Sequence, residues 1–243
     1  MHTVALQLIQ ERKIKYSNGL YRYTQTELAY NSNHIEGSTL TREHTVSLFA
    51  TDTILSAKDE IIKADDIIEM RNHFRAFDYI LDNCDAEISE KMIKQLHCIL
   101  LTGTAKADEK WFNVGEYKAV ENMIGVDEIS TCAPKDVPAA MNNLLKAYSG
   151  ISNKTVEDII DFHVKFEEIH PFQDGNGRVG RLVMFKECLA GGIMPFIIDE
   201  KHRDFYYRGL RMYPEVKGYL TDTCLSAQDK YQVVYDKLKF TLK

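Results

Sequence analysis

Apolar residues recur at helical spacing along most of this chain. Between residues 61 and 81, for example, they return every three or four positions, which is typical of one buried helix face. The pattern predicts helices over residues 3–15, 22–36, 42–56, 60–82, 90–101, 137–148, 156–169, 177–190, 202–213 and 217–241. The fold class is therefore expected to be all-α.

Helix start and stop signals agree with these ranges. Ser89 is a favoured cap at a helix N-terminus, and Pro138 is favoured in a first helical turn. Gly37, Gly103 and Gly191 each follow a helical run, where glycine commonly ends a helix.

Residues 114–131 break the helical pattern. They contain two glycines and short apolar runs without a 3.6-residue period, which favours a β-hairpin or an extended flap. No internal repeat or Pro/Gly/Ser-rich linker divides the chain. We therefore expect a single domain over residues 1–243, with one small β-hairpin in a helical bundle.

Composition limits the classes of function. A hydrophobic fraction of 44% fits a globular protein, and a formal net charge of −6 argues against a broad basic surface for nucleic acid. The five cysteines are widely spaced without a C-x-x-C pair, so neither a disulfide framework nor a zinc site is expected. Neither a signal peptide nor an apolar run of membrane-spanning length is evident. These features predict a cytoplasmic protein with no membrane or direct nucleic-acid partner.

The run HPFQDGNGRVGR, residues 170–181, carries the most specific chemistry. It combines one histidine and one acid with three glycines and two arginines. Glycine lets the backbone approach a ligand closely, and arginine binds anions. Pro171 disfavours helix at His170, whereas Val179 and Leu182 begin a new helical pattern. The predicted arrangement is a helix, a tight glycine loop and a second helix, with His170 at the C-terminus of the first.

This arrangement predicts a phosphate site. Free backbone N–H groups and the positive end of the helix dipole gather at a helix N-terminus, here Gly175, Asn176 and Gly177. Arg178 and Arg181 are three residues apart, so their side chains are expected to bind phosphate oxygens together. Asp174 is expected to hold Mg²⁺ beside a polyphosphate.

Three other motifs fit the same letters less well. Residues 175–180 match the dinucleotide fingerprint G-x-G-x-x-G, but that fingerprint must follow a strand, and the preceding segment is helical. A Ca²⁺ loop starting at Asp174 fails because its fifth and twelfth positions are Arg178 and Phe185. A Walker A loop would need a Gly-Lys-Ser/Thr ending, which is absent.

Residues 170–181 resemble the signature H-x-F-x-D/E-G-N-G-R-x-x-R of the Fic family at every defined position. The resemblance extends to the surrounding helices, the predicted hairpin and an N-terminal element, so it covers most of the chain. It implies a Fic-type helical bundle, with a catalytic core over residues 60–200 and C-terminal helices over residues 201–243. It also implies transfer of AMP from ATP to a Tyr, Thr or Ser hydroxyl of a target protein, with release of pyrophosphate.

The resemblance assigns roles within the motif. His170 becomes the general base, and an imidazole pKa near the unperturbed ~6.5 would suit that role at neutral pH. Asp174 becomes the Mg²⁺ ligand. The remaining nucleotide-binding residues are Gly175, Asn176, Gly177, Arg178 and Arg181. The alternative for His170 is a structural histidine that ends a helix and hydrogen-bonds to a neighbour.

A second motif lies in the predicted helix over residues 22–37. Ser32 and Glu36 stand one turn apart before Gly37, and an exposed acid at a helix C-terminus costs ~0.3–1 kcal/mol. The segment resembles the inhibitory motif S/T-x-x-x-E-G/N of Fic proteins. The resemblance implies a bidentate ion pair between Glu36 and Arg181 that forces ATP into an unproductive pose. The alternative is that Ser32 and Glu36 only cap the helix.

Further residues follow from the resemblance. The hairpin is expected to bind an extended segment of the target by strand addition, although it could equally be an ordinary surface hairpin. The flap residues are Glu121, Asn122, Met123, Ile124 and Gly125. Tyr207, rather than the adjacent Tyr206, is expected beside adenine, with burial in the core as the alternative. The charged run over residues 63–78 predicts an amphipathic helix with a solvated face.

The sequence thus predicts a protein adenylyltransferase that uses ATP and Mg²⁺ and is inhibited by its own N-terminal helix. Self-modification and a homodimer are further expectations for its partners, beside an unidentified target protein. Three alternatives stay open: transfer of another nucleotide or phosphate-containing group, removal of AMP from a target, and a non-catalytic nucleotide-binding regulatory module.

Overall fold

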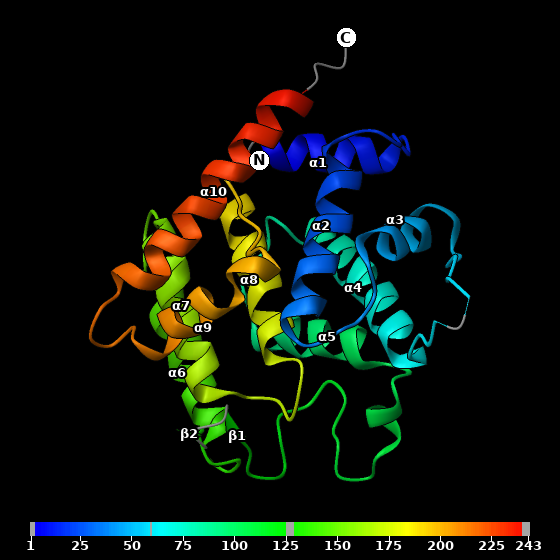
Figure 1. The fold of residues 1–243 in the computed structure, drawn as a ribbon. Coiled ribbons are helices and arrows are strands. Elements are labelled where there is room, and N and C mark those ends of the chain that lie inside the picture. Colours follow the sequence, from blue (N-terminus) through cyan, green and yellow to red (C-terminus); the bar gives the residue numbers. More distant parts are fainter. Residues whose placement is uncertain (1–2, 59, 125–128, 240–243) are drawn as a thin grey trace.

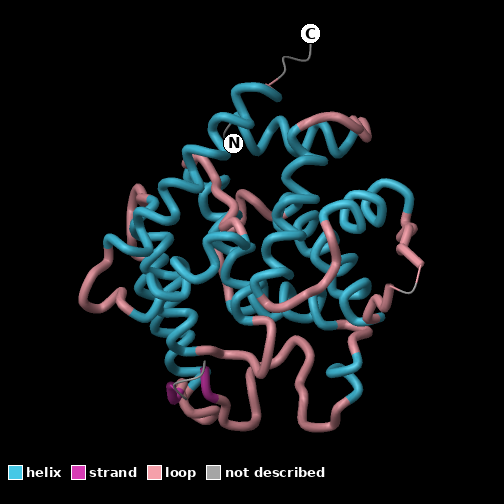
Figure 2. The backbone as a smooth tube through the Cα atoms, in the orientation of Figure 1, coloured by secondary structure: helices cyan, strands magenta, loops and turns pink. Residues whose placement is uncertain are grey.

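The chain forms a bundle of α-helices around one long central helix, α8 (Figures 1 and 2). The computed structural model describes residues 3–58, 60–124 and 129–239. Its α-helices are α1 (Thr3–Lys13), α2 (Leu20–Ile35), α3 (Arg42–Thr51), α4 (Ala64–Asp82), α5 (Glu90–Leu101), α6 (Val137–Ser149), α7 (Val156–Ile169), α8 (Asn176–Gly191), α9 (Arg203–Arg211) and α10 (Gly218–Leu238). Two short 3₁₀ helices, η1 (Ala105–Asp108) and η2 (Glu200–His202), complete the helical part.

The helices predicted from apolar spacing are confirmed, and their ends have identifiable causes. Ser89 accepts a hydrogen bond from the Met92 amide and caps α5. The largest difference is at α3, which ends at Thr51 rather than near residue 56. Asp52 adopts a left-handed conformation there, with φ of 57°, and ends the helix.

The core collects around α8. Val179 and Leu182 are fully buried on α8 and belong to the same apolar cluster as Phe162 and Phe166 of α7. Helices α2, α4, α5 and α7 all contact α8. Figure 1 shows α2 beside α8 and α4, so the N-terminal segment is part of the bundle. Residues far apart in sequence can therefore meet at the N-terminal end of α8.

The strands form a small ladder. β1 (Met123–Ile124) pairs antiparallel with β2 (Ile129–Ser130), with Met123 opposite Ser130. Residues 125–128 lie outside the described residues, and Gly125 of the expected flap is among them. Glu121 and Asn122 precede β1 in irregular backbone.

Three further observations concern the described residues alone. None of the helices there is both long and apolar enough to cross a bilayer. No group of three His, Cys, Asp or Glu side chains in them could hold a metal ion. The five cysteines are unpaired.

Candidate functional site

The signature run folds as a turn between α7 and α8. His170 caps α7 in a left-handed conformation, with φ of 50° and ψ of 62°, and its amide donates to the Phe166 carbonyl at 2.9 Å. Gly175, with φ of 78°, precedes the first residue of α8, and this positive φ favours glycine. The motif therefore forms the predicted helix, tight loop and second helix, with His170 at the C-terminal cap of α7 and Gly175 at the N-terminal cap of α8. We call residues 170–175 the motif loop.

Asn176 holds this loop in shape. Its Oδ1 accepts from the Phe172 amide at 2.9 Å, and its Nδ2 donates to the Phe172 carbonyl at 2.8 Å. Phe172 is fully buried and stacks on His97, with ring centroids 4.1 Å apart. The Asn176 side-chain amide is therefore committed to the loop backbone, and nucleotide binding by Asn176 stays a prediction. Only its main-chain N–H faces the helix N-terminus.

Arg181 meets the C-terminal end of α2. Its Nη2 lies 2.7 Å from Glu36 Oε1, while Nε donates to Ser32 Oγ at 3.0 Å and Nη2 donates to the Ser32 carbonyl at 2.9 Å. The expected ion pair forms, but through a single contact rather than two, while Ser32 accepts from Nε and Nη2. Burial works to lower the pKa of Arg181, yet the charge and hydrogen bond of Glu36, together with Tyr206 and Tyr207, outweigh it and hold that pKa above its ordinary value.

The Glu36 carboxylate also lies against the N-terminal turn of α8. A Cβ atom built on Gly177 would collide with Glu36 Oε1 and would lie 2.8 Å from Arg181 Nη1. Among the described residues, Nη1 has no hydrogen-bond partner. A negatively charged group thus lies where the amides of α8 and the guanidinium converge.

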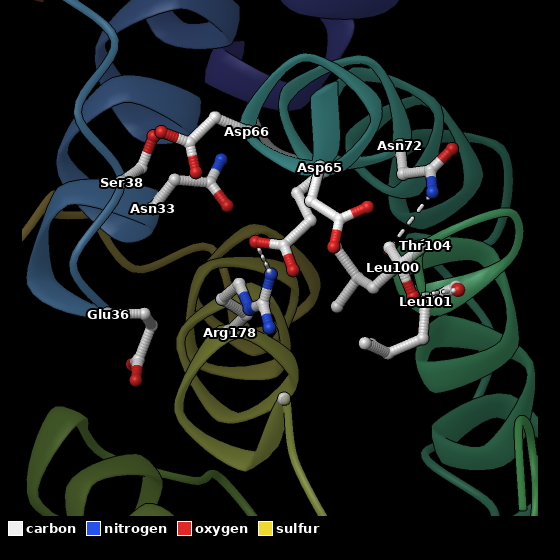
Figure 3. A network of polar contacts seen from close by, with 12 residues as sticks. Asn33, Glu36, Ser38, Asp65, Asp66, Asn72, Leu100, Leu101, Thr104 and Arg178 are labelled. Atoms are coloured by element: carbon white, nitrogen blue, oxygen red, sulfur yellow. Dashed lines mark hydrogen bonds and ion pairs between the residues drawn. The ribbon is translucent and has the colours of Figure 1, made fainter. Parts of the chain in front are cut away.

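Arg178 points the other way, toward α4. Its Nη1 lies 2.6 Å from Glu69 Oε2, and its Nη2 lies 3.7 Å from Asp174 Oδ1. Figure 3 shows the Arg178 side chain on α8 pointing toward α4. The side chain is only 2% exposed. The two arginines therefore point apart in this structure, because Glu69 holds Arg178 in the helix interface, and phosphate binding by both arginines stays a prediction. Glu69 lies on the helix face that the sequence predicted to be solvated.

Asp174 pairs with Lys106 of η1 and accepts from the Gly175 amide at 2.6 Å. Burial opposes its charge, but Arg178 and Lys106 outweigh burial and hold the pKa of Asp174 below its usual range. The carboxylate is therefore ionised at neutral pH and fits a Mg²⁺ ligand. Since it is one carboxylate without a cluster of ligands in the described residues, the phosphates would supply the other oxygens.

The environment of His170 differs from the expectation. Burial lowers the pKa of His170 to about 4, and the charge of Lys118 pushes it in the same direction. The expected pKa near the unperturbed value was wrong, since the ring lies in a mostly buried position beside a cation. Neither Lys118 nor Lys106 carried a sequence signal, because both lie in irregular segments distant from the motif.

The segment before β1 is tied to the motif loop. The Lys118 amide donates to the Pro171 carbonyl at 2.9 Å, and Asn122 Nδ2 donates to the Phe172 carbonyl at 3.2 Å. Lys118 Nζ donates to Asn122 Oδ1 and to Thr131 Oγ1, which joins the segments on both sides of the ladder. The ladder is therefore fixed beside His170, whereas target binding there stays a prediction.

The two adjacent tyrosines of α9 separate in space. Tyr206 is buried, and its hydroxyl lies 2.6 Å from His163 Nε2. Tyr207 is 36% exposed, and its hydroxyl donates to the Ile35 carbonyl at 3.3 Å, one residue before Glu36. Tyr207 therefore borders the site, and its contact with adenine stays a prediction.

Comparison with known proteins points to one family. The model of the Fic/DOC family matches residues 87–188. Proteins named protein adenylyltransferase Fic are 26% identical over 212 residues in Drosophila melanogaster and 29% identical over 188 residues in Nematostella vectensis. These matches cover 82% and 74% of this chain, but only 40% and 41% of the relatives' length. The chain thus corresponds to less than half of those proteins.

Solved structures share the whole fold. A Fic domain containing signaling protein from Bacteroides thetaiotaomicron has a TM-score of 0.75 at 21% identity, covering 99% of this chain and 98% of that one. Fic-1 from C. elegans has a TM-score of 0.73 at 18% identity, covering 97% of this chain and 72% of that one. At these identities the similarity is evidence for the fold.

Proposed function

Because the chain belongs to the Fic/DOC family, we propose that it is a nucleotidyltransferase that moves AMP from ATP to a hydroxyl group of a target protein. The relatives named adenylyltransferases support the choice of AMP. The position of His170 beside the N-terminal amides of α8 supports the chemistry, since it places a base next to a phosphate site.

In this reaction His170 acts as the general base. With its pKa near 4 the ring is neutral at pH 7 and can accept a proton. The proton passes from the target hydroxyl to the imidazole as the hydroxyl oxygen attacks the α-phosphorus. The bond between the α-phosphorus and the bridging oxygen breaks, and pyrophosphate leaves with the electron pair. Negative charge from the phosphates beside the ring favours its protonated form as the reaction proceeds.

The phosphates are held by groups of this chain. The amides of Gly175, Asn176 and Gly177 donate to phosphate oxygens at the N-terminus of α8, and Arg181 adds a charged donor once it is free. Asp174 holds Mg²⁺, which supplies positive charge against the phosphates when bound. Arg178, held by Glu69, orients Asp174 and contributes charge from behind the loop.

The observation that carries the proposal is the contact of Glu36 with Arg181 at Gly177. A carboxylate already occupies the place where an outer phosphate would bind. Resting activity is therefore expected to be low, and displacement of Glu36 is expected to raise it. The target is expected at the ladder of β1 and β2, where strand addition would bring a hydroxyl to His170.

The test compares three proteins in the same assay. Wild type, Glu36→Gly and Glu36→Gly/His170→Ala are incubated with Mg²⁺, candidate target proteins and ATP, GTP, CTP or UTP labelled at the α-phosphate. Label transfer from ATP by Glu36→Gly, and its loss in the double variant, is the expected result. Transfer that prefers another nucleotide would correct the donor. Nucleotide binding without any transfer would reject catalysis and leave a regulatory module.

A further inference from the structure

Glu167 is a largely buried acid that the mechanism above does not use. It lies on α7 one turn before His170, and its side chain is 14% exposed. Its Oε2 is 3.8 Å from His170 Nδ1, and its Oε1 is 3.9 Å from His163 Nε2. A Cβ atom on Gly180 of α8 would lie 2.5 Å from the His163 ring and 3.0 Å from Glu167 Oε1. A glycine at this position therefore leaves room for a carboxyl group between two imidazoles.

Polar atoms in this group lack partners. In the part of the chain that the structure describes, His170 Nδ1, His163 Nδ1 and Glu167 Oε1 are buried without a hydrogen bond. Buried polar atoms in proteins are almost always paired, so an unpaired ring nitrogen 3.8 Å from a carboxyl oxygen is notable. Catalytic hydrogen bonds are often long in a free enzyme and shorten when substrate binds. A small side-chain movement would join Glu167 Oε2 to His170 Nδ1.

We propose that Glu167 is a positioning residue for His170, accepting a hydrogen bond from Nδ1–H so that the lone pair on Nε2 faces the target hydroxyl. A histidine with its proton fixed on one nitrogen presents the other nitrogen as the base. When Nε2 takes the proton from the hydroxyl, an ionised Glu167 stabilises the imidazolium. This inference rests on the proposed function, because it assigns Glu167 to the base of that reaction.

The surroundings of Glu167 connect it to the contact that covers Arg181. The titratable and charged groups that face Glu167 are His163 on α7, His170 at the C-terminal cap of α7, Glu36 at the C-terminal cap of α2, Arg181 on α8, and Tyr206 and Tyr207 on α9. Burial and, less strongly, the negative charge of Glu36 raise the pKa of Glu167 to about 8, although Arg181 works to lower it. With Glu36 in place, Glu167 therefore keeps its proton at pH 7. Removal of Glu36 lowers that pKa, so Glu167 ionises at lower pH and can support the base.

The first test reads His170 directly and needs no nucleotide. Nitrogen chemical shifts of the imidazole, followed by NMR from pH 5 to 9, report its tautomer and its response to ionisation of Glu167. The background is Glu36→Gly, carrying Glu167→Gln or Glu167→Met, and the His170 signal is identified by its loss in His170→Ala. The adjacent and exposed Glu168 provides matched controls, Glu168→Gln and Glu168→Met.

The two Glu167 substitutions distinguish the role of Glu167 as a hydrogen-bond acceptor from the role of its charge. Glu167→Gln keeps an acceptor, so the Nδ1–H tautomer persists but the pH-dependent shift caused by the carboxyl group disappears. Glu167→Met loses the Nδ1–H tautomer as well as the pH-dependent shift, whereas Glu168→Gln and Glu168→Met retain the tautomer and the shift. If the Glu167 variants match their Glu168 controls, the inference is overturned. Should Glu167→Met fail to fold, the Glu167→Gln titration still decides the matter.

The second test follows the pH dependence of transfer. In the Glu36→Gly background, Glu167→Gln is expected to lower kcat by about 10- to 100-fold, less than the ~10²- to 10⁴-fold of general-base catalysis itself because His170 remains, with the KM for ATP changed by less than about threefold. The rise in rate that accompanies ionisation of Glu167 should vanish, whereas Glu168→Gln keeps it. An unchanged kcat and pH profile would contradict the role of Glu167. If no variant transfers any nucleotide, the proposed function fails, and the NMR titration still decides the contact with His170.

Discussion

Glu36→Gly tests whether the end of α2 controls Arg181. Arg181 is 4% exposed, and its only carboxylate partner among the described residues is Glu36. Loss of one partner from a buried ion pair typically costs about 3–5 kcal/mol. Ser32 retains both of its hydrogen bonds to Arg181, and Glu36 itself is 30% exposed, so we expect a smaller loss of about 2 kcal/mol. For a chain of this size, that loss corresponds to a fall in Tm of about 4–8 °C.

The same change should raise activity. Removing the carboxylate frees the Nη2 hydrogen that Glu36 accepts, and also the space beside Gly177, for a phosphate oxygen. A hydrogen bond to a charged group contributes about 1.5–3 kcal/mol, and each ~1.4 kcal/mol of transition-state stabilisation is a factor of ten in rate. Transfer from ATP should therefore increase by about 10- to 100-fold. Mg²⁺ and ATP should also restore the lost Tm, because a phosphate replaces the missing carboxylate.

Two measurements check this reasoning: thermal unfolding with and without Mg²⁺ and ATP, and transfer of AMP from α-labelled ATP. Ser32→Ala is the matched control. It removes the hydrogen bond from the Arg181 guanidinium to the Ser32 hydroxyl, worth about 1.5–3 kcal/mol because the donor is charged, but it leaves the carboxylate in place, so activation should be smaller. A Glu36→Gly protein with wild-type Tm and wild-type transfer would refute the proposed control of Arg181. A fall in Tm that nucleotide does not reverse would refute phosphate binding at that arginine.

Two further predictions concern the loop and the response to pH. Asn176→Ala removes both side-chain hydrogen bonds to Phe172 and leaves the Phe172 amide unpaired. The free energy of unfolding, measured with urea, should fall by about 1–3 kcal/mol. An unchanged free energy of unfolding would show that the motif loop does not depend on these hydrogen bonds. Burial lowers the pKa of three other histidines, His73 and His163 to about 3 and His97 to about 4. Their folded-state pKa values lie below the unfolded ~6.5, so the unfolded state binds more protons in between, and stability is present above pH ~6.5 and lost as pH falls toward 4. The difference between the urea midpoints at pH 7 and pH 5 measures this loss. This difference should be smaller in His73→Met than in wild type, and an equal difference in the two proteins would contradict the prediction.

Residue preferences at helix ends predicted where the two helices that flank this site end and begin. The proline after His170 and the glycine before Asn176 each act within one or two residues, and the end of α7 and the start of α8 lie where these residues require. The contact of Glu36 with Arg181 spans 145 positions, and only the resemblance to a known motif predicted it. Spacing on one helix could not have placed these residues together.

Helix spacing did not predict the directions of the arginine side chains, because their partners on other helices determine them. Two arginines three residues apart on a helix are expected to share a face, yet Arg178 turns toward Glu69 while Arg181 turns toward Ser32. Glu69 is an acid in a charged run, so pattern alone indicated solvent. Its burial raises the pKa of its carboxyl group despite the charge of Arg178. A charged residue on an apparently polar helix face becomes a site component only when a second helix brings its counter-ion.

The position of α2 limits how Arg181 can be released. Leu28 and Ala29 are buried in this helix, and Thr24 Oγ1 lies 2.6 Å from the Tyr231 hydroxyl of α10. Detachment of α2 would therefore expose apolar core at a cost comparable with unfolding much of the bundle. Glu36 lies after the last turn of that helix, and Gly37 follows it with φ of 97°. Because α2 and Leu40 are both buried in the core while Glu36 and Gly37 between them are exposed, an activating signal needs to move only Glu36 and Gly37, and α2 can remain in place while the site opens.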